Sequence, residues 1–495
     1  MFNINPLLLI DFYKATHDKQ LPKGMTKSVS YFTPRMSRVK RWDKVVFFGL
    51  QSFIKTYLID YFNKNFFGRS KDEVVNEYKY YMELTLGPGI ANYDKIGALH
   101  DLGYLPIEIL ALPEGTMCPI KVPCLSITNT HDDFCWLPQA LESLMSAELW
   151  YPMVCATVGK TYRDIVNKYY DLTVDDSIPR SKALSNFDFR GDKGLDAALK
   201  AGSGWCTSFA LSATVPIVPY LEKMYPSDCS KEDVAYGGIS TEHFVMCSNY
   251  AVDGDEESFI KRLITEVYPK GNVSCVMDSY DYWNVIDNIL PSLKNEILGR
   301  DGTLLCRGDS GDPIDVVTTT VFKLWDTFGG TINNKGYKVL DPHVKAIYGD
   351  SITVERCEAI YKILMDNGFA CNNVSLGVGS FSFQCIEEDG ILKPFTRDVF
   401  GMALKACDAV INGVEYPIFK DPKTDREAGG ESFKKSQKGC ILVENTGDTL
   451  IATDGLKYAD TLVPHNMLKP VFLNGSLMRT YSLKEVRANL NNNNF

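Results

Sequence analysis

The stretch Leu304–Pro313, which reads LLCRGDSGDP, decides the fold class of this chain. Its apolar start predicts a short strand, and apolar residues then recur at helical spacing over residues 314–328. Asp312 is a favourable N-cap residue, and the proline after it suits the first helical position. The turn between strand and helix holds the guanidinium of Arg307 and the carboxylate of Asp309. Because α/β proteins bind ligands at the carboxyl ends of their strands, this turn is a candidate site.

The same layout recurs at three neighbouring places in the chain. Strand-like segments at 274–277, 344–348 and 374–376 each end in an acidic or glycine-rich turn, and helical patterns lie between them. This alternation predicts consecutive βα units, whose turns meet on one face. Acidic turns suit Mg²⁺ and sugar hydroxyls, while glycine-rich turns let backbone N–H groups approach a phosphate. The three turns read DSYD at 278–281, GD at 349–350 and GVGS at 377–380.

The two ends of the chain resemble each other and differ from its middle. Helices and short strands mix over residues 1–179, βα units follow over 180–385, and strands and loops return over 386–495. We therefore expect the two ends to combine into one α+β domain around an inserted α/β domain. The polar segment 421–439 is long for a connection, which predicts a lid or a disordered excursion.

Composition excludes several classes of protein. A net charge of −10 over 495 residues argues against affinity for nucleic acid. No apolar run reaches the roughly 18 residues of a membrane span, and Asp11 comes too early for a signal peptide. The fourteen cysteines are scattered without a CxxC pair, which predicts reduced thiols and neither a zinc site nor a disulfide framework. We therefore expect a cytoplasmic protein that binds neither membrane nor nucleic acid.

Twelve segments along the chain carry a family resemblance, in order and in spacing. They lie at 11–17, 46–51, 105–108, 113–115, 150–152, 187–191, 241–243, 278–281, 307–311, 349–350, 396–398 and 419–422. Through them the chain resembles the nicotinamide phosphoribosyltransferases over essentially its full length. The resemblance implies an irregular α/β barrel of the type II phosphoribosyltransferase kind, packed on an α+β domain, in a head-to-tail homodimer.

The resemblance also implies a reaction. The ring nitrogen of nicotinamide displaces pyrophosphate from phosphoribosyl pyrophosphate, which gives nicotinamide mononucleotide for NAD salvage. Since C1 of the ribose becomes cationic in the transition state, carboxylates and Mg²⁺ must balance charge around it. The family pattern assigns Asp281 and Asp309 to Mg²⁺, ribose and pyrophosphate, and Arg307 and Arg190 to phosphate oxygens.

The family pattern places further substrate contacts along the chain. Phe187 and Tyr13 are expected to stack on either face of the pyridine ring, with Tyr13 and Asp11 coming from the second subunit. His243 is expected to take a phosphoryl group from ATP, a stimulating co-substrate, with Glu242 and Asp281 orienting its ring. The remaining expected contacts to ribose and phosphate are Gly308, Gly349, Asp350, Gly379, Ser380, Arg397, Lys405 and Lys420.

One residue departs from the family pattern in a way that bears on substrate choice. Ala213 stands where the family has an aspartate that accepts a hydrogen bond from the amide of nicotinamide. Its loss removes both the attraction for the amide and the repulsion of a carboxylate, while Ser212 beside it could contact either. Nicotinate is therefore an alternative base, and a catalytically silent nucleotide-binding protein is a third possibility.

Overall fold

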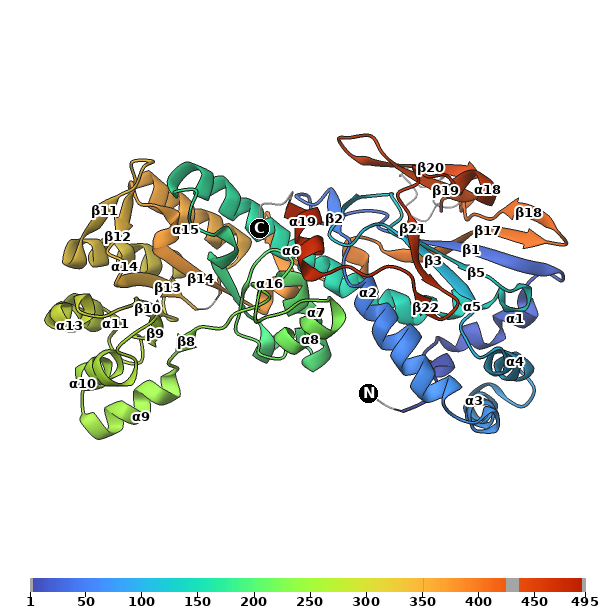
Figure 1. The fold of residues 1–495 in the computed structure, drawn as a ribbon, viewed down its shortest axis with the longest axis horizontal. Coiled ribbons are helices and arrows are strands. Elements are labelled where there is room, and N and C mark those ends of the chain that lie inside the picture. The colour runs from blue at the N-terminus through green and yellow to red at the C-terminus, as the bar shows by residue number, and fades with distance from the viewer. Residues whose placement is uncertain (1–2, 350, 424–435, 492–495) are drawn as a thin grey trace. The chain divides into compact units, whose positions relative to one another are not determined.

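The computed structural model describes residues 3–349, 351–423 and 436–491. These residues divide into two compact units (Figure 1). Of the described residues, the first unit contains 3–154, Lys223–Ser227 and 393–491 apart from the gap at 424–435. The second contains Cys155–Glu222 and Asp228–Leu392. Within the described residues, no helix is long and apolar enough to cross a membrane.

The second unit is built on a seven-stranded sheet in the order β7-β6-β14-β13-β10-β9-β8, in which all neighbours run parallel. The strands are β6 (Leu184–Phe187), β7 (Leu211–Ser212), β8 (Ile239–Ser240), β9 (Val273–Val276), β10 (Leu304–Gly308), β13 (Val344–Tyr348) and β14 (Val374–Gly379). Leu211 of β7 also forms an isolated parallel bridge with Tyr236, just before β8. The two edges of the sheet therefore meet there, and the predicted irregular barrel is confirmed.

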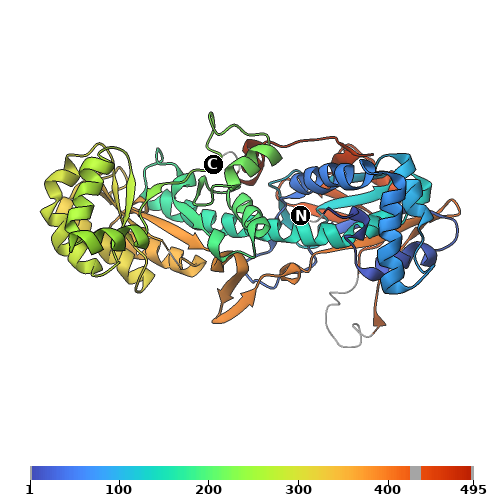
Figure 2. The same cartoon turned by 90° about the horizontal axis from the view of Figure 1, so that it is seen from below.

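Helices follow the strands of this barrel and flank the sheet in both views (Figures 1 and 2). They are α7 (Leu195–Trp205), α8 (Ile217–Met224), α9 (His243–Asp253), α10 (Glu257–Arg262), α11 (Tyr282–Asn284), α12 (Leu290–Ser292), α13 (Lys294–Leu298), α14 (Pro313–Phe328), α15 (Val354–Asp366) and α16 (Phe381–Gln384). A small hairpin of β11 (Gly330–Ile332) and β12 (Lys338–Leu340) follows α14.

The predicted turn between β10 and α14 is confirmed in detail. Asp312 caps α14, since one carboxylate oxygen accepts hydrogen bonds from the backbone N–H groups of Ile314 and Asp315, each at 3.0 Å. The helix ends before Gly329, whose φ of +72° suits a glycine. Its apolar stripe is buried, because every third or fourth side chain lies over the sheet. The helix thus holds the β10 turn in place.

The first unit is an α+β domain built from both ends of the chain, as predicted. Its sheet has the order β18-β17-β1-β5-β3-β21-β22, and all neighbours run antiparallel. The strands are β1 (Met25–Thr33), β3 (Ile107–Ala111), β5 (Leu125–Asn129), β17 (Ala403–Ile411), β18 (Val414–Pro417), β21 (Lys469–Leu473) and β22 (Ser476–Leu477). The pairing of β1 with β17 joins the two ends of the chain.

Helices and three further two-stranded sheets complete the description (Figure 1). The helices are α1 (His17–Gln20), α2 (Leu50–Phe53), α3 (Lys71–Leu86), α4 (Asp94–Leu102), α5 (Leu137–Ala140), α6 (Glu142–Thr173), α18 (Tyr458–Thr461) and α19 (Leu483–Asn491). Two of these sheets are hairpins, formed by β15 (Cys385–Glu388) with β16 (Ile391–Pro394) and by β19 (Cys440–Asn445) with β20 (Leu450–Leu456). The third pairs β2 (Lys44–Val46) with β4 (Met117–Pro119).

The unit boundaries lie at other residues than those expected from the sequence. We placed them after 179 and 385, whereas the compact units divide after Val154 and after Leu392. The first division falls inside the continuous helix α6. Helical periodicity does not change there, so the sequence carries no local signal of that boundary.

Candidate active site

A network of charged side chains lies at the carboxyl end of β10. Arg307 donates from Nε to Oδ2 of Asp309 at 3.1 Å, and a terminal guanidinium nitrogen lies 3.0 Å from the same oxygen in an ion pair. The other oxygen of Asp309 accepts from the backbone N–H of Gly349, at 3.1 Å. A Cβ atom at Gly349 would lie 2.3 Å from that oxygen, so only glycine fits beside the carboxylate. The turns after β10 and β13 therefore meet, as the parallel layout predicts.

Asp278 joins this network to His243. Its Oδ1 lies 3.0 Å from Nε2 of His243, and its Oδ2 accepts from the backbone N–H of Asp309 at 3.0 Å. Burial alone would raise the pKa of Asp278, but hydrogen bonds from Ser310, the Asp309 backbone and His243 outweigh it and lower the pKa. The pKa of Asp309 is raised, because burial outweighs the effect of Arg307. Asp278 is therefore the ionised partner of a half-exposed histidine.

The expected partners of His243 need correction. Glu242 is exposed, and its carboxylate accepts no hydrogen bond from the ring of His243, which bonds to Asp278 instead. Asp281 caps the next helix, where its Oδ1 accepts from the backbone N–H of Asn284 at 3.0 Å. Asp278 orients the ring instead. It lies two residues after β9, and β9 pairs with β8, which ends shortly before His243. The sequence contained the signal, because Asp278 opens the DSYD turn.

Phe187 lies at the carboxyl end of β6, beside this network. A Cβ atom at Gly377 of β14 would lie 2.4 Å from the ring of Phe187 and 2.9 Å from the carbonyl oxygen of Gly349. The glycine therefore leaves the space that the ring occupies. From the sequence, Gly377 was only part of a glycine-rich turn, and its contact with Phe187 was missed.

The turn after β6 also meets the turn after β14. A Cβ atom at Gly191 would lie 2.0 Å from the hydroxyl oxygen of Ser380, and the side chain of Gln384 donates to the Gly191 carbonyl at 2.7 Å. Arg190, next to Gly191, is exposed. Two turns that the resemblance assigned to phosphate and ribose are thus neighbours.

The region of Ala213 lies at the end of β7, next to β6. Ala213 is exposed, and its backbone N–H donates to the carbonyl of Asn186 at 3.0 Å. Ser212 is buried, and its hydroxyl oxygen accepts from the backbone N–H of Thr214 at 3.1 Å. The hydroxyl of Ser212, which we expected to be able to contact the base, therefore bonds to the backbone in this structure.

Comparisons with known proteins identify the family. A sequence model described as the nicotinamide phosphoribosyltransferase N-terminal domain matches residues 5–109, and one described as the nicotinate phosphoribosyltransferase family matches residues 230–475. A nicotinamide phosphoribosyltransferase of Acinetobacter baylyi is 38% identical over 99% of this chain and 97% of its own length. This chain belongs to the nicotinamide phosphoribosyltransferase family. A relative of the same description from Xanthomonas campestris is 30% identical over 98% of this chain and 97% of its own length.

Solved structures share the fold of this family member. A nicotinate-nucleotide pyrophosphorylase from Pyrococcus furiosus has a TM-score of 0.58 at 14% identity, over 98% of this chain and 95% of that one. Human nicotinic acid phosphoribosyltransferase has a TM-score of 0.55 at 15% identity, over 98% and 93%. These likenesses support the type II phosphoribosyltransferase fold.

Other expected site residues of this phosphoribosyltransferase lie in the α+β unit. Tyr13 is 59% exposed, unusually high for a tyrosine, and its hydroxyl donates to Asp11 at 3.4 Å. Lys405 lies 3.6 Å from the carboxylate of Glu142, and Arg397 is half-exposed. Asp350 and residues 424–435, within the segment expected to act as a lid, lie outside the described residues.

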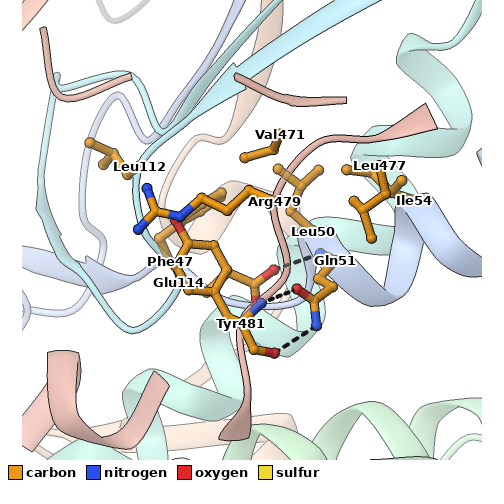
Figure 3. A pocket seen from close by; sticks show the side chains of 10 residues that line it. All are labelled: Phe47, Leu50, Gln51, Ile54, Leu112, Glu114, Val471, Leu477, Arg479 and Tyr481. Atoms are coloured by element: carbon orange, nitrogen blue, oxygen red, sulfur yellow. Dashed lines mark hydrogen bonds between the residues drawn. The ribbon is translucent and has the colours of Figure 1, made fainter. Parts of the chain in front are cut away.

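A pocket in the same unit has a structural role (Figure 3). Glu114 beside it is 2% exposed and accepts from the backbone N–H groups of Gly49 and Gln51 and from the hydroxyl of Tyr225, at 3.1, 2.5 and 2.7 Å. The side-chain amide of Gln51 accepts a hydrogen bond from the backbone N–H of Tyr481 at 2.6 Å and donates one to the Tyr481 carbonyl at 2.9 Å. These groups satisfy one another, so we assign the pocket to core packing.

Proposed function

We propose that this protein transfers the phosphoribosyl group of phosphoribosyl pyrophosphate to nicotinamide, giving nicotinamide mononucleotide and pyrophosphate in NAD salvage. The observation that carries the proposal is the network of Arg307, Asp309, Asp278 and His243 at the carboxyl ends of parallel strands. Family membership supports the same reaction. The buried thiols and acidic net charge suit the cytoplasm.

In this proposal the chain's own charges act on the bond that breaks. Arg307 and Arg190 bind phosphate oxygens of the leaving pyrophosphate, because a guanidinium binds them in bidentate fashion. Asp309 lies next to the ribose and stabilises the positive charge that develops at C1. The hydrogen bond from Gly349 and the ion pair with Arg307 hold that carboxylate before substrate arrives. The ring nitrogen of nicotinamide then forms the new bond to C1 as the C1–O bond breaks.

The acidic residues of the site fit the Mg²⁺ that the family implies. Asp309 and Asp281 supply hard oxygen donors. Asp281 uses one oxygen to cap α11. Mg²⁺ bound through one or two carboxylates takes its other ligands from substrate phosphates and water. Bound there, Mg²⁺ would neutralise charge on the leaving pyrophosphate.

His243 is the proposed acceptor of a phosphoryl group from ATP. Its hydrogen bond to Asp278 occupies Nε2, so Nδ1 is the nitrogen left to attack the terminal phosphorus. The N–P bond forms as the bond from that phosphorus to ADP breaks. The Asp278 carboxylate stabilises the positive charge that the ring acquires.

The pyridine ring is proposed to lie between Phe187 and the partner subunit's Tyr13, in a site completed by the homodimer. The exposure of Tyr13 supports this arrangement, since a stacking residue of a shared site needs a free face. Asp11 holds the tyrosine hydroxyl. Gly379, Ser380, Arg397, Lys405 and Lys420 are proposed to bind ribose and phosphate around the ring.

Nicotinate is a second candidate base, because the exposed position 213 carries a methyl group in place of a carboxylate. The test offers nicotinamide and nicotinate in parallel with phosphoribosyl pyrophosphate and Mg²⁺, each with and without ATP, and separates the mononucleotides by chromatography. We expect product from nicotinamide and stimulation by ATP.

The control for this assay is Asp309→Asn, which keeps the size of the side chain. We expect it to lower turnover about a hundredfold or more, because it removes a fixed charge next to C1. Preference for nicotinate would show that Ala213 had changed the base. No product from either base, or full activity of the variant, would overturn the proposed site.

A further inference from the structure

Three potential metal ligands meet in the α+β unit, apart from the residues assigned to catalysis. Asp408 lies on β17, Glu415 on β18 and Cys440 on β19 (Figure 1). One carboxylate oxygen from each acid and the sulfur of Cys440 all lie within 4.8 Å of one another. Asp408 is 2% exposed and Cys440 is fully buried. Asp408 and Glu415 lie on consecutive strands, and Cys440 joins them from a strand further along the chain.

The carboxyl group of Asp408 lies in a negatively charged environment. It is buried and faces the thiol of Cys440 and the carboxyl group of Glu415, with which it shares a hydrogen bond. Glu415 also accepts, at Oε1, a hydrogen bond from the backbone N–H of Tyr458 at 2.5 Å. A buried carboxyl group in contact with a second one is costly unless a proton or a cation lies between them.

We propose that Asp408, Glu415 and Cys440 bind a zinc ion. A thiolate with two carboxylates suits zinc, which accepts sulfur and oxygen ligands in fourfold coordination. Mg²⁺ and Ca²⁺ favour oxygen ligands alone. Binding releases the thiol proton of Cys440 and the proton shared by Asp408 and Glu415 to solvent, and a water molecule completes the coordination.

The proposed ion would tie two parts of the α+β unit together. Asp408 and Glu415 belong to the large sheet, and Cys440 begins the separate β19–β20 hairpin. The two already meet at the Cys407 carbonyl, which accepts from the backbone N–H groups of Ile418 and Gly439 at 2.7 and 2.8 Å. The site goes beyond the proposed transfer reaction, and its role is to stabilise this junction.

The experiment uses the full chain without an affinity tag. Titration with Co²⁺, a spectroscopic substitute for zinc, should give visible bands and a thiolate-to-cobalt band in the near ultraviolet. After equilibrium dialysis against Zn²⁺, the wild type should retain about one more ion per chain than Cys440→Ser. Asp408→Asn and Glu415→Gln, which keep side-chain size, should weaken binding at least tenfold.

Cys407→Ser is the matched control. Cys407 is a buried thiol next to Asp408 on the same strand, and its sulfur donates to the carbonyl of Lys405 rather than to the cluster. This variant should keep the cobalt thiolate band. A wild type without that band, or a band and a zinc stoichiometry unchanged in Cys440→Ser, would overturn the proposal. Either result can be read without assaying phosphoribosyl transfer.

Discussion

At the scale of single residues, Asp278 links the histidine to the strand-end carboxylate. Its two oxygens bond to His243 and to the backbone of Asp309. We predict that Asp278→Asn lowers ATP stimulation about 10- to 100-fold, because a hydrogen bond to a charged group contributes about 1.5–3 kcal/mol. Product formation with and without ATP measures this. Glu242→Gln should leave the ratio of rates with and without ATP unchanged. If ATP stimulation were lost in Glu242→Gln and kept in Asp278→Asn, Glu242 would be the residue that orients His243.

A second residue-scale prediction concerns Asp188, a buried carboxyl group. It accepts from the side chains of Asn186 and Thr214, at 2.8 and 3.3 Å, yet burial raises its pKa to about 6. Because the folded state holds this proton more tightly than the unfolded state, the stabilisation present below the ordinary pKa of about 4 is lost as pH rises through about 6.

Asp188→Asn removes this titration. Relative to the wild type, the variant should gain about 1 kcal/mol of stability between pH 5 and pH 7.5. Thermal midpoints of both proteins at the two pH values measure the change. A difference between variant and wild type that does not vary with pH would contradict the raised pKa.

At the scale of elements, Gly377 on β14 leaves room for the ring of Phe187 on β6. Gly377→Ala would bring a methyl group against the ring of Phe187. We predict about a fivefold rise in KM for nicotinamide, since misplacing a stacked aromatic ring costs about 1 kcal/mol. The KM for phosphoribosyl pyrophosphate should change less. Gly238→Ala is the control, because a Cβ atom there meets nothing within 4 Å, and equal effects of both variants would contradict the prediction.

At the scale of the whole molecule, the proposed site takes residues from two subunits. Tyr13→Ala and Asp309→Asn should each be poorly active at low nicotinamide. Co-expressed, they should recover about a quarter of the wild-type rate, because half of the dimers are mixed and each mixed dimer has one intact site of two. If the co-expressed variants are only as active as the mean of the two separate variants, the shared-site arrangement is wrong. Tyr13 and Asp309 of one subunit would then belong to the same site, or Tyr13 would lie outside the site.

Local sequence determined the elements that carry the chemistry. Asp312 and the proline after it predicted the start of α14 correctly, and the strands at 304–308 and 344–348 lie where their apolar runs are. These features depend on neighbours in the chain, through capping and side-chain periodicity. The turns of the parallel strands were therefore predictable as one site.

Tertiary structure alone decided which side chains touch. Asp278 rather than Glu242 or Asp281 contacts His243, Gly377 leaves room for Phe187, and Asp408 meets Cys440. The absence of a CxxC pair argued against a zinc site. The pairing of β17 with β18 and the approach of β19 nevertheless bring the three proposed ligands together. Such contacts depend on long-range strand pairing and packing, which local propensity does not encode.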